Sequence, residues 1–234
     1  MNHTASSSLL ENPSPLPPEN LAESFFHKLS QPIGALYASL ELGLMNDDPK
    51  QLKSAIEAGL TQLERLRWLF QVAREFFTID YCARAEEVSV RECVAAAVKD
   101  ATPLAESKQV RVSIFVRQDA EVLVDPVHFR NAVENLLSHC IRRSAGGTNI
   151  KVEIRAEGNT ARIQISDQSR FDSEFAQAAF EPFPPGVQIG PDQSGNLDLC
   201  LSQRIVRCFG GEINLRATAE RTNCFEVTLP RHNS

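Results

Sequence analysis

Apolar residues recur at steps of three and four along two consecutive stretches of the chain, and this spacing predicts two long helices. The first helix is predicted over residues 19–45 and the second over residues 49–77, with a polar, proline-containing turn between them. The apolar stripe of the first helix consists of Leu21, Phe25, Leu29, Ile33, Leu36, Leu40 and Leu44. Two such helices in sequence indicate a helical hairpin.

The second predicted helix carries a heptad pattern, in which apolar residues stand seven positions apart and small or apolar residues follow three positions later. These positions are Ile56, Leu63, Phe70 and Phe77, together with Gly59, Leu66 and Ala73. A lone hairpin cannot cover such a seam, so we expect two copies to pair into a dimeric four-helix bundle. The alternative is that the hairpin packs on the C-terminal part of its own chain.

From residue 84 onward the pattern changes to short apolar runs separated by shorter helical stretches. Strands are predicted at residues 87–90, 110–116, 121–124, 149–156, 160–166, 212–217 and 224–229, and helices at residues 91–107, 126–144 and 197–209. Antiparallel hairpins with three helices indicate an α+β sandwich with its helices on one face of a mixed sheet. The predicted organisation is a disordered tail over residues 1–18, a helical hairpin over 19–80 and an α+β domain over 84–231.

Composition narrows the functional classes. Hydrophobic residues make up 42% and charged residues 23% of the 234 positions, which is ordinary for a globular protein. A net charge of −6 gives no support to nucleic-acid binding. We expect no membrane segment and no secretory signal, because the sequence has neither a long apolar run nor a basic and apolar N-terminus. The six dispersed cysteines, with no CxxC pair, indicate reduced thiols and a cytoplasmic protein rather than a zinc site or disulfide framework.

His27 is the residue with the clearest chemical potential. On a helical wheel it lies opposite the apolar stripe of the first predicted helix, so its imidazole faces solvent. An exposed, neutral imidazole can act as a nucleophile. Pro32 stands five residues later, where it frees a backbone carbonyl and is expected to kink the helix just past the histidine. Taken alone, His27 also fits an ordinary surface histidine.

The surroundings of His27 favour the functional interpretation. The segment 26–36, which reads FHKLSQPIGAL, resembles the H-box of sensor histidine kinases, and later segments resemble the other boxes of that family in the same order. These are residues 125–144 for the N-box, 165–169 for the G1 box, 180–183 for the F-box, 197–213 for the G2 helix and following strand, and 222–230 for the closing strand.

The resemblance implies a fold and a set of functional residues. The fold would be a dimerisation and histidine-phosphotransfer hairpin followed by a GHKL, Bergerat-type ATP-binding domain. His27 would be the phosphorylated residue, with Gln31 in a possible supporting role. Asn135, Asp167 and Gly195 would mark the nucleotide pocket.

Several positions depart from the family pattern. Active kinases carry an acidic proton acceptor after the histidine, and Lys28 cannot accept a proton while it is charged. Gln31 stands where a Thr or Asn holds a phosphatase water. His139 replaces the Mg²⁺-binding asparagine, although imidazole is a poor ligand for Mg²⁺. Ser169 replaces a glycine after the G1 aspartate. Asp198 replaces a G2 glycine, either as a negative charge near a triphosphate or as the N-cap of the next helix.

A phosphoacceptor histidine beside a damaged ATP site resembles kinase-like histidine phosphotransferases. Such a protein takes a phosphoryl group from the aspartate of one response-regulator receiver domain and passes it to another. We therefore expect receiver domains as partners, a homodimer, no nucleic acid, no metal site and no cofactor. ATP and Mg²⁺ would be needed only if the alternative of an active soluble histidine kinase holds. A non-catalytic pseudokinase scaffold, or another GHKL protein such as an anti-sigma kinase or a chaperone-type ATPase, completes the alternatives.

A receiver docking surface is predicted on the first helix. Residues 27, 31, 34, 38 and 41 share one helical face. They are His27, Gln31, Gly34, Ala38 and Glu41, so two small residues follow the histidine where long polar side chains are usual. The helix kink offers another reason for Gly34, and the functional reason is close approach of a partner helix.

Overall fold

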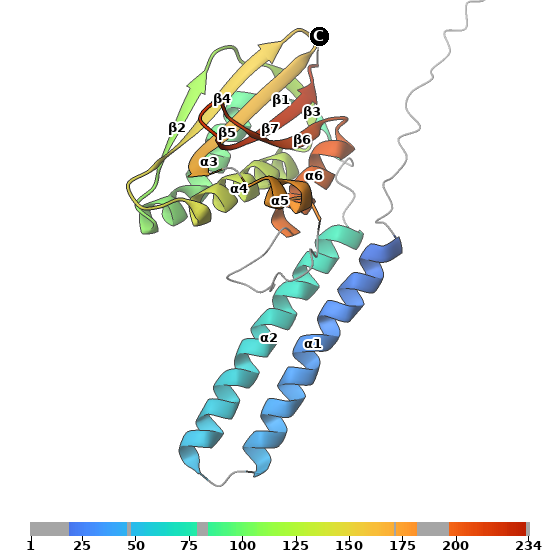
Figure 1. Ribbon diagram of the computed structural model, residues 1–234. Coiled ribbons are helices and arrows are strands. Elements are labelled where there is room, and N and C mark those ends of the chain that lie inside the picture. Colours follow the sequence, from blue (N-terminus) through green and yellow to red (C-terminus); the bar gives the residue numbers. More distant parts are fainter. Residues whose placement is uncertain (1–18, 46–47, 79–83, 171, 182–196, 233–234) are drawn as a thin grey trace, which may run out of the picture.

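The computed structural model describes residues 19–45, 48–78, 84–170, 172–181 and 197–232 (Figure 1). The predicted tail over residues 1–18 and the predicted pocket residue Gly195 lie outside the described residues. Of the helical side chains, those of Leu21 and Phe77 are also outside the description.

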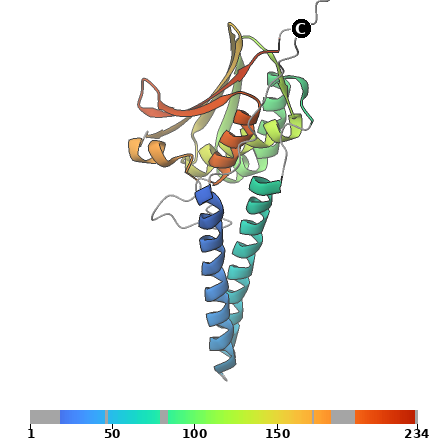
Figure 2. The same ribbon diagram turned by 90° about the vertical axis from the view of Figure 1, so that its right-hand side faces the viewer.

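Two helices form the N-terminal hairpin: α1 spans Glu19–Met45 and α2 spans Pro49–Thr78. They run side by side along their whole length in both views (Figures 1 and 2). Gly59 of α2 allows a close approach, because a Cβ atom there would lie 3.3 Å from Cδ1 of Leu36 on α1. α1 continues through Pro32 as one helix.

Where the hairpin meets the rest of the chain, its side chains are buried. The rings of Phe25 and Phe76 lie 5.7 Å apart between their centroids, and both belong to the buried cluster that continues into the C-terminal domain. Further from this junction three of the heptad residues stay uncovered: Ile56 is 50% exposed, Leu63 48% and Phe70 59%. The heptad residues Gly59 and Leu66 are buried within the single chain. The hairpin therefore packs on its own domain at one end and leaves an apolar seam open along the rest.

The C-terminal domain contains the predicted mixed sheet and three long helices. The helices are α3 (Val90–Ser107), α4 (Pro126–Arg143) and α6 (Leu197–Cys208). The strands are β1 (Glu86–Ser89), β2 (Arg111–Val116), β3 (Glu121–Val124), β4 (Asn149–Glu157), β5 (Thr160–Arg170), β6 (Glu212–Ala217) and β7 (Thr222–Pro230). Five strands are ordered β2-β4-β5-β7-β6, with β2 and β4 parallel and the other neighbours antiparallel, while β1 and β3 form a separate antiparallel pair.

The helices α3, α4 and α6 cover one face of the five-stranded sheet (Figures 1 and 2). Alternating residues of β4 and β5 turn inward, such as Val152 and Ile163, and are fully buried. On β7, Glu226 is only 4% exposed, and its carboxylate accepts hydrogen bonds from Arg162 and Gln164 at 2.7 and 3.1 Å. The sheet is thus apolar toward the helices and held by ion pairs across its other face.

Two features differ from the sequence predictions. The strand predicted to end at residue 166 continues to Arg170, and a short helix, α5 (Ser173–Ala178), follows where only irregular structure was expected. No apolar periodicity marks this six-residue helix. Its start is set locally, because the Asp172 carboxylate accepts the backbone N–H groups of Glu174 and Phe175.

Candidate functional site

His27 lies on an exposed turn of α1, as its place opposite the apolar stripe predicts. Gln31, one turn further along, is also exposed, and Lys28 is half-buried. The Ser30 hydroxyl donates to the Phe26 carbonyl at 2.9 Å, so it bonds its own helix rather than the histidine. The imidazole of His27 is therefore accessible to a partner molecule and has no acidic residue next to it in sequence.

Exposed small residues follow His27 along α1. Gly34 faces open space, since a Cβ atom built there would have no heavy atom of another residue within 4 Å. Ala38 and Glu41 are exposed as well. Sequence reasoning missed Tyr37, which is 64% exposed and whose hydroxyl pKa is raised by a hydrogen bond to Glu41. Glu41 is thus engaged by a neighbour, and Tyr37 borders the predicted docking face.

A second group of predicted residues lies where α4 meets the sheet. Asp167 on β5 is 3% exposed; its carboxylate accepts the Ser169 N–H at 2.7 Å and the Asn223 amide at 3.4 Å. Its second oxygen, Oδ2, is buried and has no hydrogen-bond partner among the described residues. Burial raises the pKa of Asp167, and burial together with this carboxylate raises the pKa of the neighbouring Cys140 thiol. Asn135 lies on α4 and is half-buried.

His139, one turn after Asn135 on α4, is packed as an aromatic side chain. Its ring stacks on Phe175 of α5, with centroids 5.5 Å apart and planes 10° apart, and meets Phe225 of β7 edge-on at 5.6 Å. Its Nε2 atom is buried without a hydrogen-bond partner among the described residues. Burial, reinforced by the positive charges of Arg143 and Arg142, lowers the pKa of His139 to about 3. The imidazole is therefore neutral, and it packs against the rings of Phe175 and Phe225.

Arg142 and Arg143, at the end of α4, are both exposed, and each also contacts a side chain of another element. The Arg143 guanidinium lies 4.5 Å from the ring centroid of Phe175. The Arg142 guanidinium lies 3.4 Å from the carboxylate of Asp198. Since α6 begins at Leu197, Asp198 lies inside its first turn and is not the N-cap. The extra carboxylate of Asp198 thus pairs with the end of α4.

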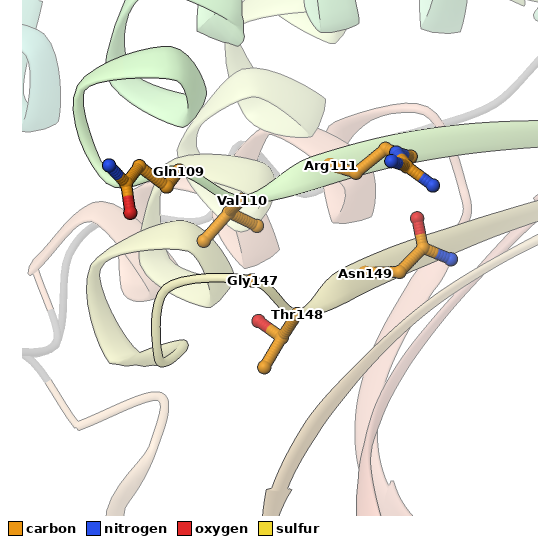
Figure 3. A pocket seen from close by; sticks show the side chains of 6 residues that line it. All are labelled: Gln109, Val110, Arg111, Gly147, Thr148 and Asn149. Atoms are coloured by element: carbon orange, nitrogen blue, oxygen red, sulfur yellow. The ribbon is translucent and has the colours of Figure 1, made fainter.

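A separate polar hollow of about 350 Å³ lies where β2 and β4 begin (Figure 3). Its lining residues are Gln109, Val110, Arg111, Gly147, Thr148 and Asn149. The side chains of Arg111 and Asn149 extend from the two parallel strands on one side (Figure 3). None of the predicted site residues lines this hollow, and no catalytic constellation is found in it.

Comparison with known proteins shows which class of protein the chain is similar to. Residues 124–233 match the family model described as histidine kinase-, DNA gyrase B- and HSP90-like ATPase. The virulence sensor protein BvgS of Bordetella pertussis is 25% identical over 220 residues, which are 87% of this chain and 17% of BvgS. The sensor protein IrlS of Burkholderia pseudomallei is 24% identical over 223 residues, 88% of this chain and 46% of IrlS. The chain therefore spans less than half the length of these relatives.

Solved structures agree with this assignment. The histidine kinase AdeS of Acinetobacter baumannii matches with a TM-score of 0.57 and 19% identity, over 88% of this chain and 98% of that one. Histidine kinase ThkA, solved in complex with response regulator protein TrrA, matches with a TM-score of 0.66 and 16% identity, over 92% of this chain and 62% of that one. At these identities the likeness concerns the fold. The chain is similar to the catalytic core of sensor histidine kinases, in which a helical hairpin is followed by a GHKL-type ATPase domain.

The family implies ATP and Mg²⁺, and the residues present fit only part of that ligand. Of the residues that the resemblance assigns to the nucleotide pocket, buried Asp167 has one carboxylate oxygen, Oδ2, that fits a hydrogen-bond donor. At the position of the Mg²⁺-binding asparagine, which marks the metal and phosphate end of that pocket, His139 offers a buried, ring-packed nitrogen, although this ion prefers oxygen ligands. A search of the described residues finds no helix that is long and apolar enough to cross a membrane. Among the same residues, no group of three or more possible metal-ligating side chains comes together. The metal and phosphate end of the pocket therefore does not fit Mg²⁺–ATP.

Proposed function

We propose that this protein is a histidine phosphotransferase of two-component signalling. His27 would accept a phosphoryl group from the aspartate of one response-regulator receiver and pass it to another. The observation that carries this proposal is the contrast between an accessible His27 and a pocket whose metal and phosphate end does not fit Mg²⁺–ATP. A structural neighbour, ThkA, has been solved with a response regulator, which supports a receiver as the kind of partner.

The reaction needs little from the protein beyond position. A ring nitrogen of neutral His27 uses its lone pair to attack phosphorus, and the bond between phosphorus and the aspartate oxygen breaks. The electron pair leaves with the carboxylate, and the proton on the other ring nitrogen passes to solvent. Because His27 is exposed, water can take this proton without an acidic neighbour.

The proposal is tested by asking which donor labels His27. Purified protein is incubated with labelled ATP and Mg²⁺, and separately with a receiver carrying labelled aspartyl phosphate. We expect labelling within minutes from the receiver and none from ATP. Labelling by ATP alone would favour the active kinase, which the free oxygen of Asp167 also supports. Labelling by neither donor would leave the scaffold interpretation.

The working form is proposed to be a homodimer through α1 and α2. Its support is the uncovered seam, in which heptad residues Ile56, Leu63 and Phe70 are about half exposed in the single chain. Exposed apolar side chains in a regular row favour burial against a second copy. In that arrangement the two His27 side chains would lie on the outer surface of a four-helix bundle.

The receiver is proposed to dock on the low surface formed by Gly34, Ala38 and Glu41. All three are exposed, and nothing overhangs Gly34. Replacing Ala38 by Arg should slow transfer from a phospho-receiver at least about tenfold, because in-line transfer tolerates little displacement. Ala95→Arg on α3 is the matched control, since Ala95 is equally exposed on the other domain. Unchanged transfer by Ala38→Arg, with the dimer intact, would place docking elsewhere.

A further inference from the structure

Phe175 joins the short helix α5 to α4. No residue of α5 is fully buried, and Phe175 is half-buried. Its ring is contacted by two side chains of α4, His139 by parallel stacking and Arg143 through its guanidinium. Because His139 and Arg143 are four residues apart, they project from the same side of α4 and meet the ring together. We call these three residues the aromatic clamp.

The aromatic clamp lies at the end of the domain that holds Asp167. The Ser169 hydroxyl, two residues after Asp167, donates to the Arg143 carbonyl at 3.3 Å. Behind the clamp, Phe225 meets His139 edge-on, and its strand partner Ile165 lies two residues before Asp167. The clamp and the pocket carboxylate are therefore neighbours, and the clamp includes the position where the family carries its Mg²⁺-binding asparagine.

The contacts of the clamp are mutually supportive. Stacked and edge-on rings attract each other beyond the gain from burial, and a guanidinium over a ring face adds a cation–π interaction. His139 suits this environment only as a neutral ring, which its low pKa ensures at physiological pH. Arg142 extends the closure, because its ion pair with Asp198 joins the end of α4 to the first turn of α6. An asparagine in place of His139 would put an amide among rings and would lose the stacking.

We propose that Phe175 is an internal ligand: held by His139 and Arg143, its ring occupies the metal and phosphate end of the nucleotide pocket. The domain then closes on its own side chain and reaches its native structure without nucleotide. This inference deepens the proposed function and rests on its claim that ATP is not the phosphoryl donor. It also explains why His139 is compatible with the fold although it cannot replace the asparagine as a Mg²⁺ ligand.

Four full-length proteins test the proposal: the unmodified chain, His139→Asn, Phe175→Ala and the double variant. Each is titrated with a fluorescent ATP analogue in the presence of Mg²⁺. If Phe175 occupies the site, the His139→Asn variant regains a side chain that can bind Mg²⁺, but the Phe175 ring still fills the space. This variant should therefore bind the analogue no better than the unmodified chain. The double variant should bind the analogue at least tenfold more tightly than either the unmodified chain or His139→Asn. Equal binding by His139→Asn and the double variant would contradict the proposal, as would no gain in any variant.

Thermal unfolding gives a second measurement on the same proteins. Removing the ring should lower the Tm by several degrees, and Phe175→Leu replaces Phe175→Ala in both measurements if the alanine variant does not fold. Phe180→Ala is the control, because the Phe180 ring is also half-buried and meets the same Phe225 at 6.4 Å. It should lower the Tm without any gain in nucleotide binding. A gain equal to that of the Phe175 variants would show that general loosening, not a vacated site, admits the nucleotide.

The two proposals fail in different ways. Micromolar binding of the analogue by the unmodified chain, without labelling of His27, would overturn the internal ligand and leave the phosphotransferase standing. Absence of transfer from any phospho-receiver, with a gain of binding in the double variant, would overturn the phosphotransferase and leave the internal ligand standing.

Discussion

The two histidines of greatest interest lie in opposite environments. His27 is exposed on a helix where the exposed small residues Gly34 and Ala38 follow it, and the hairpin that carries it has an uncovered apolar seam. His139 is stacked on Phe175 and lies edge-on to Phe225. Its domain is further held together by the Arg142–Asp198 ion pair. The hairpin thus exposes groups that other molecules can reach, and the C-terminal domain is proposed to fill the metal and phosphate end of its pocket with its own Phe175. This division suits a protein that receives a phosphoryl group from outside rather than making one.

The strongest test of this contrast is His27→Gln. The substitution removes the nucleophile, so labelling from a phospho-receiver should fall by roughly a thousandfold or more. Because His27 is exposed, circular dichroism and the Tm should stay unchanged. The matched variant His139→Gln should be labelled at the normal rate. Persistent labelling of His27→Gln would move the phosphoacceptor to another residue.

Leu63→Glu tests whether the open seam is a dimer interface. A carboxylate in a buried seam costs about 3 kcal/mol or more, which would weaken the dimer by about a hundredfold. Sedimentation equilibrium measures the change. Leu123→Glu on β3 is a fair control, since Leu123 is 49% exposed against 48% for Leu63. A stable monomer of the unmodified chain would refute the dimer outright.

His139→Gln should affect stability where His27→Gln does not. The variant loses the stacking on Phe175 and buries an amide that needs hydrogen bonds, at a cost of about 2 kcal/mol. For a chain of this size the Tm should fall by about 5 °C. An unchanged Tm would mean that the rings around His139 contribute little to holding the domain together.

The smallest expected effect comes from Asp167→Asn. Burial raises the folded-state pKa of Asp167, so its charged form opposes folding, and this penalty grows as pH rises through that pKa. The asparagine variant should therefore be slightly more stable at neutral pH, with the advantage vanishing at a pH below the ordinary value of 3.8. Parallel thermal melts at several pH values measure this. A loss of stability at neutral pH would show that the hydrogen bonds from Ser169 and Asn223 outweigh burial.

Periodicity was enough to predict most of the fold. The long helices α1, α2, α3 and α4 and most strands follow from apolar spacing. In α3 and α4 the apolar face is buried against the rest of the domain, whereas in α1 and α2 much of it is exposed. The short helix α5 could not be found this way, since it buries no face and begins at a local cap. The end of β5 was placed too early for a similar reason, because residues 167–170 are mostly polar.

The two candidate sites differed in how far sequence could reach. The exposure of His27 follows from its place on one helix, so a wheel was sufficient. The surroundings of His139 depend on Phe175 and Phe225, which come from α5 and β7 and meet only in the folded domain. For the same reason the sequence did not show that exposed Arg143 contacts Phe175. The histidine at residue 139, where the family has asparagine, indicated that this position is unusual. The sequence did not show that Phe175 and Phe225 contact it.

Pro32 has a dynamic consequence for the hairpin. Since it lacks an N–H group, the carbonyl of Lys28 loses its partner within α1, in the turn that carries His27. The helix is continuous there but one hydrogen bond weaker, so amide exchange with deuterium should be faster around residues 28–31 than in neighbouring turns. A small bend at this turn would then cost little energy. If His27 is the phosphoacceptor, as proposed, its side chain could then adjust its direction to two different partners without unfolding the helix on either side.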